Sequence, residues 1–399
     1  MSKVNVLVYC DRVSKSSGGI YQYTAGLVKT LAEVDSNKVN IYFLVSKNSD
    51  LLKEINFDQD SLIHPEEYKL SIKYKIKNLI ERAGSLYYKR LIKRHYHPYF
   101  YTVLDVIINN FNIDIIHYPF QKLIKRKYVR TISTMHDVQE LHFPEFFTSQ
   151  ERRQRAINYK RVIDEADHIV VSYEHIRKDI SRYFAKPKTK VSTILLKMDN
   201  LWFKEINQIR DDNLPFEKYI LYPAATWAHK NHLKLLEALQ LLKEQDNISI
   251  NLVCTGHKKD LYYESIQPFI KCNALQDHIK FLGVVENETL FTLYQKCLGV
   301  VVPTLYEAGS FPLMESILMN IPVVCSNVTS LPETVDNQEF IFDPTNVESI
   351  ALKVKELWLS EDFRERSKAN SERVQERLTN TNALEKFCRL YDSLINSNE

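Results

Sequence analysis

Residues 299–344, GVVVPTLYEAGSFPLMESILMNIPVVCSNVTSLPETVDNQEFIFDP, contain the succession of elements that decides the fold. The run 299–303 is rich in valine and too short for a helix, which is typical of a strand buried on both faces. A polar loop follows, and Pro312 stands where a helix can begin, because its fixed φ suits the first helical position. A second valine-rich strand at 323–326 completes a β-loop-α-β unit. We therefore expect a ligand site in the loop, since parallel sheets bind ligands at strand carboxyl ends, beside helix amino termini.

Two carboxylates frame this loop. Glu307 lies within it, and Glu315 follows on the first turn of the predicted helix. Because Pro312 separates them, both side chains can point into one crevice. The spacing alone is equally consistent with a simpler interpretation, in which Glu315 complements the helix dipole and Glu307 is a solvated loop charge.

The whole segment resembles a known family. The run YEAGSFPLMESILMNIPVVCSNVTSLPETV, followed by FDP at 342–344, resembles the E-x7-E signature of the retaining glycosyltransferases of family 4, which have the GT-B fold. Ala308 and Ser310 stand where the commonest version has glycines, and Asn320 replaces the usual glycine at the predicted left-handed exit of the helix. These departures make the loop backbone less free, but they remove no side chain that the chemistry needs.

The resemblance and the chain length imply the same architecture. A chain of 399 residues exceeds what one core usually supports. We expect an α/β protein of GT-B type, with two facing Rossmann-like doubly wound domains and a cleft between them. The expected parts are an acceptor-binding domain at 1–200, a hinge at 201–215, a nucleotide-sugar-binding domain at 216–375, and a final helix at 376–399 that crosses back to the first domain.

Composition describes an ordinary globular protein and bounds its partners. Hydrophobic residues make up 44% and charged residues 26%, and the net charge of +3 is too small to indicate a nucleic-acid partner. Six cysteines are scattered without metal-ligand spacing, which favours free thiols in a reducing compartment. The sequence enters a strand pattern at once, and no apolar run approaches the roughly 20 residues needed to span a bilayer. We expect a cytoplasmic protein.

Two features of the first half could contribute to a site. Gly18 and Gly19 follow a predicted strand at 4–9 and precede a helix, so a ligand could approach the backbone N–H groups there, although glycine pairs are also common in ordinary turns. The GxGxxG spacing of nicotinamide dehydrogenases is absent. His136 directly follows another predicted strand, whose carboxyl end would line the cleft; without the family resemblance a lone histidine is more often structural. The other strands are predicted at 39–45, 114–117, 131–135, 168–172, 191–195, 219–223, 248–255 and 279–282.

The second half offers a cationic loop. His229, Lys230 and Asn231 precede a predicted helix with a leucine stripe. A lysine at a helix amino terminus is electrostatically unfavourable unless an anion binds there or the side chain points to water. The run WAHKNH is similar to the donor-phosphate loop of the family, although the arginine that many members carry a few residues earlier is missing.

The resemblance implies a role for each of these residues. Glu307 and His136 would act at the donor sugar near its reacting carbon, and Glu315 would bind the ribose hydroxyls. The donor diphosphate would be held by a lysine and two glycine-bearing loops: Gly18, Gly19, Lys230, Gly309, Ser310 and Phe311. No divalent metal and no other cofactor are implied, and the anomeric configuration would be retained.

Residues 69–97 form a strongly basic segment, with nine Lys or Arg against the single acid Glu81. Isoleucines and leucines alternate with the charges, and such a basic amphipathic helix can lie on an anionic membrane surface. The alternative is an exposed helix pair whose lysines keep the protein in solution. The residues that we assign to membrane or acceptor contact are Lys73, Lys77, Arg90 and Lys93.

Taken together, the sequence predicts a retaining enzyme that moves a hexose-type sugar, such as mannose or rhamnose, from a nucleoside-diphosphate sugar to a glycan or lipid-linked glycan. Assembly of a bacterial surface polysaccharide is the expected setting. Two alternatives remain: a nucleotide-sugar 2-epimerase, and a catalytically silent subunit that tethers partners at a membrane.

Overall fold

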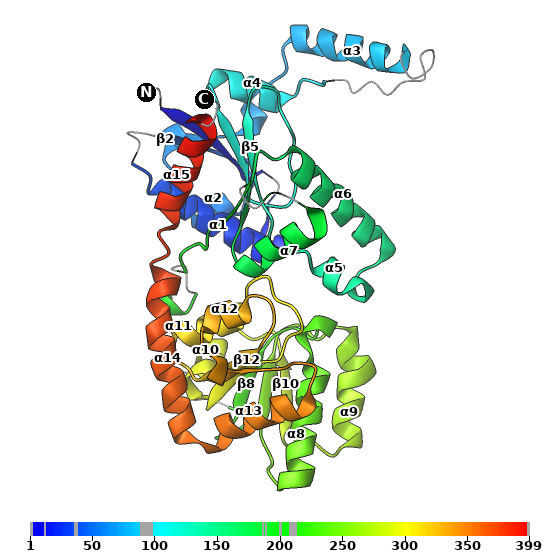
Figure 1. The fold of residues 1–399 in the computed structure, drawn as a ribbon, viewed down its shortest axis with the longest axis vertical. Coiled ribbons are helices and arrows are strands. Elements are labelled where there is room, and N and C mark those ends of the chain that lie inside the picture. The colour runs from blue at the N-terminus through cyan, green and yellow to red at the C-terminus, as the bar shows by residue number, and fades with distance from the viewer. Residues whose placement is uncertain are drawn as a thin grey trace.

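The chain forms two α/β domains, one above the other in Figure 1. The computed structural model describes residues 3–11, 13–35, 39–87, 99–185, 187, 190–198, 202–206 and 214–396. Each domain is built on one parallel sheet with helices on both faces. This arrangement confirms the prediction of two doubly wound domains.

The amino-terminal sheet has seven strands in the order β3-β2-β1-β4-β5-β6-β7, all pairs parallel. Its strands are β1 (Val4–Tyr9), β2 (Val39–Leu44), β3 (Leu62–Ile63), β4 (Ile115–Tyr118), β5 (Arg130–Thr134), β6 (His168–Val171) and β7 (Val191–Thr193). The helices of this domain are α1 (Gly19–Ala32), α2 (Leu51–Glu54), α3 (Ile72–Tyr87), α4 (Val103–Asn110), α5 (Gln139–His142), α6 (Ser149–Glu165) and α7 (Glu174–Phe184).

The carboxy-terminal sheet has six strands in the order β10-β9-β8-β11-β12-β13, again all parallel. The strands are β8 (Ile220–Pro223), β9 (Leu252–Thr255), β10 (Ile279–Gly283), β11 (Gly299–Val302), β12 (Val323–Ser326) and β13 (Ile341–Phe342). The helices are α8 (His232–Asp246), α9 (Gln267–Cys272), α10 (Asn287–Lys296), α11 (Phe311–Leu318), α12 (Leu331–Val335), α13 (Val347–Leu359), α14 (Glu361–Thr379) and α15 (Ala383–Asn396).

The strand order of each sheet reverses at one point, and these points position the sites. In the amino-terminal sheet the reversal lies between β1 and β4, and in the carboxy-terminal sheet it lies between β8 and β11. The loops after two such strands diverge to opposite faces, which leaves a crevice at the carboxyl end of the sheet. The glycine pair follows β1, Lys230 follows β8, and Glu307 follows β11.

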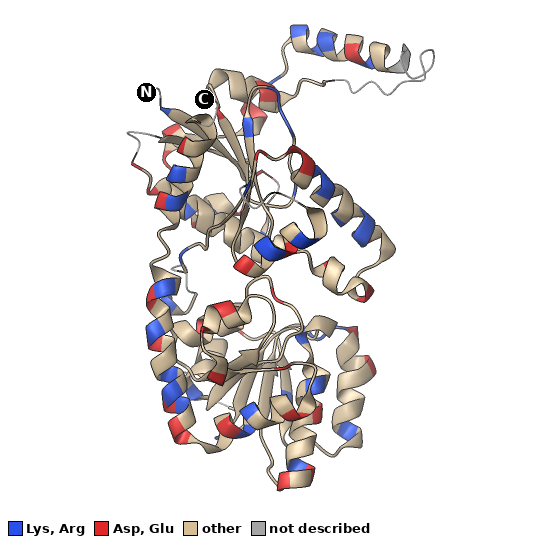
Figure 2. Ribbon diagram, viewed as in Figure 1, with Lys and Arg blue, Asp and Glu red and all other residues tan. Residues whose placement is uncertain are grey.

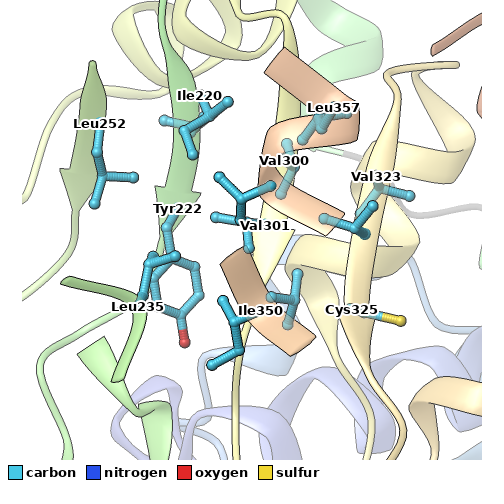
Figure 3. Packing of buried hydrophobic residues seen from close by; sticks show 14 of the residues in the cluster. Ile220, Tyr222, Leu235, Leu252, Val300, Val301, Val323, Cys325, Ile350 and Leu357 are labelled. Carbon is cyan, nitrogen blue, oxygen red and sulfur yellow. The ribbon is translucent and has the colours of Figure 1, made fainter. Parts of the chain in front are cut away.

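The core of the carboxy-terminal domain explains why its strands are so apolar. All four residues of β11 are buried, as are those of β12, because helices cover both faces of the sheet. Figure 3 shows side chains of the central strands with those of α8 and α13 packed against them. The residues labelled there are Ile220, Tyr222, Leu235, Leu252, Val300, Val301, Val323, Cys325, Ile350 and Leu357.

Most predicted elements are found, with shifts at their ends. The strand at 4–9 is β1, and the turn after α11 has Asn320 at φ +56°, as expected for a left-handed exit. The strand predicted at 248–255 begins only at Leu252. The two-residue strands β3 and β13 were not predicted, since two residues carry no periodicity.

The last two helices run along one side of the molecule and join the domains. α14 packs on α11 and α12, whereas α15 lies against α1 and β1 of the other domain (Figure 1). The contact is specific as well as apolar, because the Tyr391 hydroxyl lies 2.9 Å from Nδ1 of His117 in the buried core. Residues 383–396 are therefore part of the amino-terminal core.

Candidate functional site

Lys230 and Glu307 meet at the reversal point of the carboxy-terminal sheet. Nζ of Lys230 lies 2.5 Å from Oε1 of Glu307, and both side chains are more than four-fifths buried. Lys230 ends a single turn before α8, and Asn231 follows at φ +61°, a conformation that asparagine tolerates. The Asn231 amide donates to the carbonyls of Pro303 and Pro344, at 2.9 and 2.8 Å, which fixes the lysine loop to the end of β11.

The start of α11 presents an unused hydroxyl. Ser310 is the N-cap of α11 and is 2% exposed, yet its Oγ has no hydrogen-bond partner among the described residues. Buried hydroxyls are normally hydrogen-bonded, so an orphan beside a helix amino terminus indicates a ligand position. Gly309 precedes it, and a Cβ there would lie 3.1 Å from the Tyr173 ring of the other domain. Phe311, the first residue of α11, is half-buried.

Glu315 lies on the next turn of α11 and is already hydrogen-bonded. Its Oε1 accepts from Nε1 of Trp202 at 2.7 Å, and its Oε2 accepts from the Tyr294 hydroxyl at 2.8 Å. Burial raises the pKa of Glu315, and these two hydrogen bonds partly offset the effect. Each carboxylate oxygen has a further lone pair, so the group can still accept from a ligand hydroxyl.

His136 is half-buried at the end of β5. Its Nε2 lies 2.9 Å from the Pro119 carbonyl oxygen, which can only accept, so Nε2 carries the proton. Burial lowers the pKa of His136, and the ring is therefore neutral near pH 7. A neutral ring with hydrogen on Nε2 offers Nδ1 as an acceptor for a hydroxyl group.

The glycine turn begins α1, the helix whose Tyr23 contacts this histidine. Gly18 has φ +56°, a left-handed conformation that glycine adopts without strain, and it caps α1. Both Gly18 and Gly19 are exposed, which leaves the first N–H groups of α1 accessible. Tyr23 of α1 contacts His136 edge-on, with ring centroids 4.7 Å apart.

Contacts between the domains bring the two halves of the site together. The Val138 N–H, two residues after His136, donates to the hydroxyl of Tyr306 at 3.2 Å, and Tyr306 directly precedes Glu307. A second bridge joins α7 to α12, where the Glu174 N–H donates to the Glu333 carboxylate at 3.0 Å. The loops that carry His136 and Glu307 are thus adjacent. Within the part of the chain that the structure describes, no hydrogen bond or ion pair joins the glycine pair to Lys230.

A cavity of about 610 Å³ opens at the reversal point of the amino-terminal sheet. Its wall combines aromatic rings with hydrogen-bonding side chains, a combination typical of small-molecule binding sites. The cavity is formed by the ends of β1 and β4, the residues that follow them, and one face of α6. Its lining includes Tyr9, Asp11, Tyr118, Phe120, Gln121, Lys122, Phe147, Gln154, Arg155 and Asn158.

A charged network fixes the wall nearest His136. Arg155 of α6 pairs with Asp137 and donates from Nε to Glu140 at 2.8 Å. The Tyr159 hydroxyl donates toward the same two carboxylates, at 3.2 and 3.3 Å. Gln121 donates to the Asp137 carbonyl at 2.6 Å. These bonds join the cavity wall to the loop that carries His136.

The structure places the remaining predicted residues away from this region. Lys73 and Lys77 are exposed on α3, and Arg90 and Lys93 lie outside the described residues. Among the described residues there is no group of three or more His, Cys, Asp or Glu side chains that could hold a metal ion.

Several participants were not anticipated from the sequence. Trp202 lies 113 positions before its partner Glu315, in a 3₁₀ helix (Trp202–Glu205) of the segment expected to be a hinge, and nothing local marks it. Tyr306 and Arg155 likewise contact residues on other elements, Val138 and Asp137 respectively, and nothing in their local sequence indicates these contacts. Asp137 could have been found, because it directly follows His136 at the end of a predicted strand.

The chain is similar in sequence to known glycosyltransferases. Residues 205–374 match a family model described as "Glycosyl transferases group 1", which indicates a glycosyltransferase domain. The O-antigen chain mannosyltransferase B of Escherichia coli is 27% identical to this chain over 244 residues. The matched region is 59% of this chain and 63% of that relative, so the match spans less than two thirds of the relative's length. The O-antigen chain mannosyltransferase RfbU of Salmonella typhimurium is 20% identical over 355 residues, which are 88% of this chain and 90% of that protein.

The fold likeness extends over the whole molecule. A glycosyltransferase from Rickettsia africae superposes with a TM-score of 0.66 over 100% of both chains, at 16% sequence identity. The fold is therefore GT-B, as the sequence resemblance predicted.

Proposed function

We propose that this chain transfers a hexose-type sugar, mannose in the first instance, from a nucleoside-diphosphate sugar to a glycan acceptor. The anomeric configuration of the sugar is retained in this reaction. The proposal starts from a GT-B fold whose carboxy-terminal domain matches the group 1 glycosyl transferases. The observation that carries the proposal is the buried Lys230–Glu307 pair beside the orphan hydroxyl of Ser310. The mannosyltransferase relatives support the choice of sugar.

The leaving diphosphate would bind between Lys230 and the start of α11. Negative charge develops on that diphosphate as the glycosidic bond breaks, and preorganised donors in a site of low dielectric stabilise it most. Lys230 supplies a cation, the N–H groups at the start of α11 supply a positive dipole end, and Ser310 supplies a hydroxyl. Gly18 and Gly19 would add the N–H groups of α1 from the opposite domain.

The carboxylates would position the rest of the donor. Glu315 keeps acceptor capacity for the ribose hydroxyls, because each oxygen accepts only one hydrogen bond in the structure. Glu307 would lie near the anomeric carbon, where its negative charge favours the positive character of the transition state. His136, neutral and with Nδ1 free of the proton, would accept from a sugar hydroxyl.

The acceptor would occupy the cavity of the amino-terminal domain. It lies at the reversal point of that sheet, and the Arg155–Asp137 network connects its wall to the loop of His136. Rings such as Tyr9 and Phe120 can cover the apolar faces of sugar units, and the amides and charged groups can bond their hydroxyls. A cavity of this size holds a short stretch of glycan.

We propose that the reaction belongs to bacterial surface-polysaccharide assembly in the cytoplasm and that the acceptor is a lipid-linked glycan. The relatives that act on O-antigen chains support this setting. No divalent metal is needed in this scheme, since lysine and helix termini would hold the phosphates.

One experiment tests the proposal. Nucleotide sugars are screened for thermal stabilisation of the protein, and the one that stabilises most is incubated with and without a lipid-linked mannan primer. Transfer to the primer, with an axial product linkage from an axial donor by nuclear magnetic resonance, is the expected result. A product that is only the epimerised donor would replace the transferase with an epimerase, and a Glu307→Gln variant that keeps full transfer would remove Glu307 from the reaction.

A further inference from the structure

Helix α3 exposes a continuous apolar stripe. Ile72, Ile76, Leu79 and Ile80 are 75%, 53%, 67% and 64% exposed. With about 3.6 residues per turn, these positions fall on one side of the helix. The helix itself stands away from the rest of its domain (Figure 1). Large aliphatic side chains in such a contiguous exposed group indicate a surface that something else covers.

The opposite side of α3 is the one that holds it to the protein. Asn78 donates to the Tyr101 carbonyl at 2.8 Å and accepts from the Tyr101 N–H at 2.7 Å. Tyr74 stacks on Tyr101 with ring centroids 4.6 Å apart, and Asn109 of α4 donates to the Tyr74 hydroxyl at 3.3 Å. The domain thus fixes the orientation of α3 with its apolar stripe outward.

Positive charge borders the stripe on both sides. By helical position, Lys73 and Lys77 lie along one border and Lys75 and Arg82 along the other, whereas the one acid of α3, Glu81, lies on the opposite face. Figure 2 shows the basic residues spread along α3. Long basic side chains can cross the edge of an apolar layer and bond anionic groups at its surface, as in interfacial helices.

The neighbouring surface has the same character and leads to the cavity. Residues 122–128, hereafter the 122–128 loop, expose Ile124 and Tyr128 together with lysines. Contacts to the 99–101 segment join this loop to α3, since Nζ of Lys127 lies 4.9 Å from the centre of the Tyr99 ring. Lys122 and Ile124 also line the cavity.

We propose that α3 and the 122–128 loop form a docking face for an anionic lipid bilayer, with the isoleucines of α3 in the headgroup layer and its lysines on lipid phosphates. Charge complementarity selects this occupant over a second copy of the chain, because packing two such stripes would bring the positive borders of both copies together. No helix among the described residues is long and apolar enough to cross a membrane. The inference rests on α3 and is independent of the transfer reaction.

The test is co-sedimentation of the full chain with vesicles of phosphatidylglycerol and phosphatidylethanolamine, with phosphatidylcholine vesicles for comparison. We expect the wild type to bind the anionic vesicles and to lose only part of this binding at high salt. A K73Q/K75Q/K77Q variant should bind about tenfold more weakly or worse at low salt. An I76S/L79S/I80S variant should bind at low salt but be released at high salt.

Two controls keep the result specific. A K243Q/K271Q/K368Q variant removes the same charge from the carboxy-terminal domain and should bind like the wild type. All variants should keep the wild-type nucleotide affinity and a melting temperature close to that of the wild type, because the altered side chains are exposed or only half-buried and lie outside the proposed donor site. Wild-type protein that stays in the supernatant at low salt overturns the proposal. So does concentration-dependent dimerisation that the I76S/L79S/I80S variant abolishes, which would make a second copy the occupant.

Discussion

The indole N–H of Trp202 donates to the Glu315 carboxylate at 2.7 Å, across 113 positions of sequence. The contact joins the segment between the two domains to the helix that would bind the nucleotide. It also satisfies a carboxylate that burial would otherwise leave costly to ionise. A hydrogen bond thus connects the segment between the domains to the proposed nucleotide site.

Trp202→Phe should test this link. Removal of the indole N–H leaves a buried carboxylate with one hydrogen bond fewer, and we expect a loss of about 1.5–3 kcal/mol in the free energy of unfolding. Urea denaturation measures it. Trp227→Phe is the matched control, since Trp227 is 50% exposed and should change stability by less than about 0.5 kcal/mol. Equal effects of the two substitutions would show that the Trp202 bond is energetically unimportant.

Lys230→Ala should weaken binding of a nucleoside diphosphate by about 1.5–3 kcal/mol, because a charge-assisted bond to phosphate is lost. Titration calorimetry gives the affinity. Lys234→Ala provides the control, one turn along α8, where the lysine pairs with Glu237 at the surface. If both variants bind the nucleotide like the wild type, Lys230 has no part in the phosphate site.

Ser310→Ala separates a ligand role from a structural one. The Ser310 hydroxyl makes no hydrogen bond among the described residues, so its removal should leave stability unchanged or raise it. The same substitution should lower diphosphate affinity by about 0.5–1.5 kcal/mol, the usual contribution of a neutral hydrogen bond. A variant that loses stability but keeps its affinity would contradict this assignment.

Stability should fall as pH drops below about 6.5, the ordinary pKa of histidine. Burial lowers the pKa of five histidines: His117, His136, His175, His229 and His232. Below about pH 6.5 the unfolded chain therefore binds protons that the folded chain excludes, and the free energy of unfolding decreases. The decrease continues until the pH reaches the pKa of the folded state, which is about 4 for His175 and His229. One histidine with a folded-state pKa of about 4 lowers the free energy of unfolding at pH 5 by about 2 kcal/mol relative to neutral pH.

Urea unfolding between pH 7.5 and pH 5 measures this dependence. The raised pKa of Glu315 acts in the opposite direction, because the folded state then holds a proton more tightly than the unfolded chain. A His175→Gln variant should show a shallower slope by about one proton. A wild-type stability that does not change over this interval would mean that these rings can be protonated in the folded protein.

Activity should persist in excess EDTA. The proposed phosphate site consists of Lys230, Ser310 and helix amino termini, and a hard cation prefers clustered carboxylates instead. Initial rates with and without chelator decide the matter. A rate that collapses with EDTA and returns with Mg²⁺ or Mn²⁺ would show that the phosphates are held by a metal ion.

The sequence predicted those elements that local patterns determine. The valine-rich strands on either side of Glu307 predicted a sheet with helices on both faces. Pro312 and Asn320 predicted the two ends of α11 to within about one helical turn. The order of the strands within each sheet was not predicted, because no single segment contains that information. Lys230 and Glu307, which the structure brings into contact, both lie in short motifs that can be recognised in the sequence.

What could not be predicted depends on contacts between distant segments. The Lys230–Glu307 bond, the Trp202–Glu315 bond and the bridge from Val138 to Tyr306 each join residues more than 70 positions apart. Local periodicity contains no information about such pairs. Similarly, the basic pattern of α3 suggested an amphipathic helix, but only the fold reveals which side the protein leaves uncovered.

The return of α15 to the amino-terminal domain has a consequence for how the protein is made. Phe387 and Tyr391 complete a core whose other members, such as Leu27 and Val28, are synthesised more than 350 residues earlier. Domains usually fold in order as they leave the ribosome, but here the first domain lacks part of its interior until residues 383–396 emerge. The core of the second domain is continuous in sequence, so this domain can reach its native state first. Until residues 383–396 are available, the incomplete core of the first domain exposes apolar side chains that can aggregate.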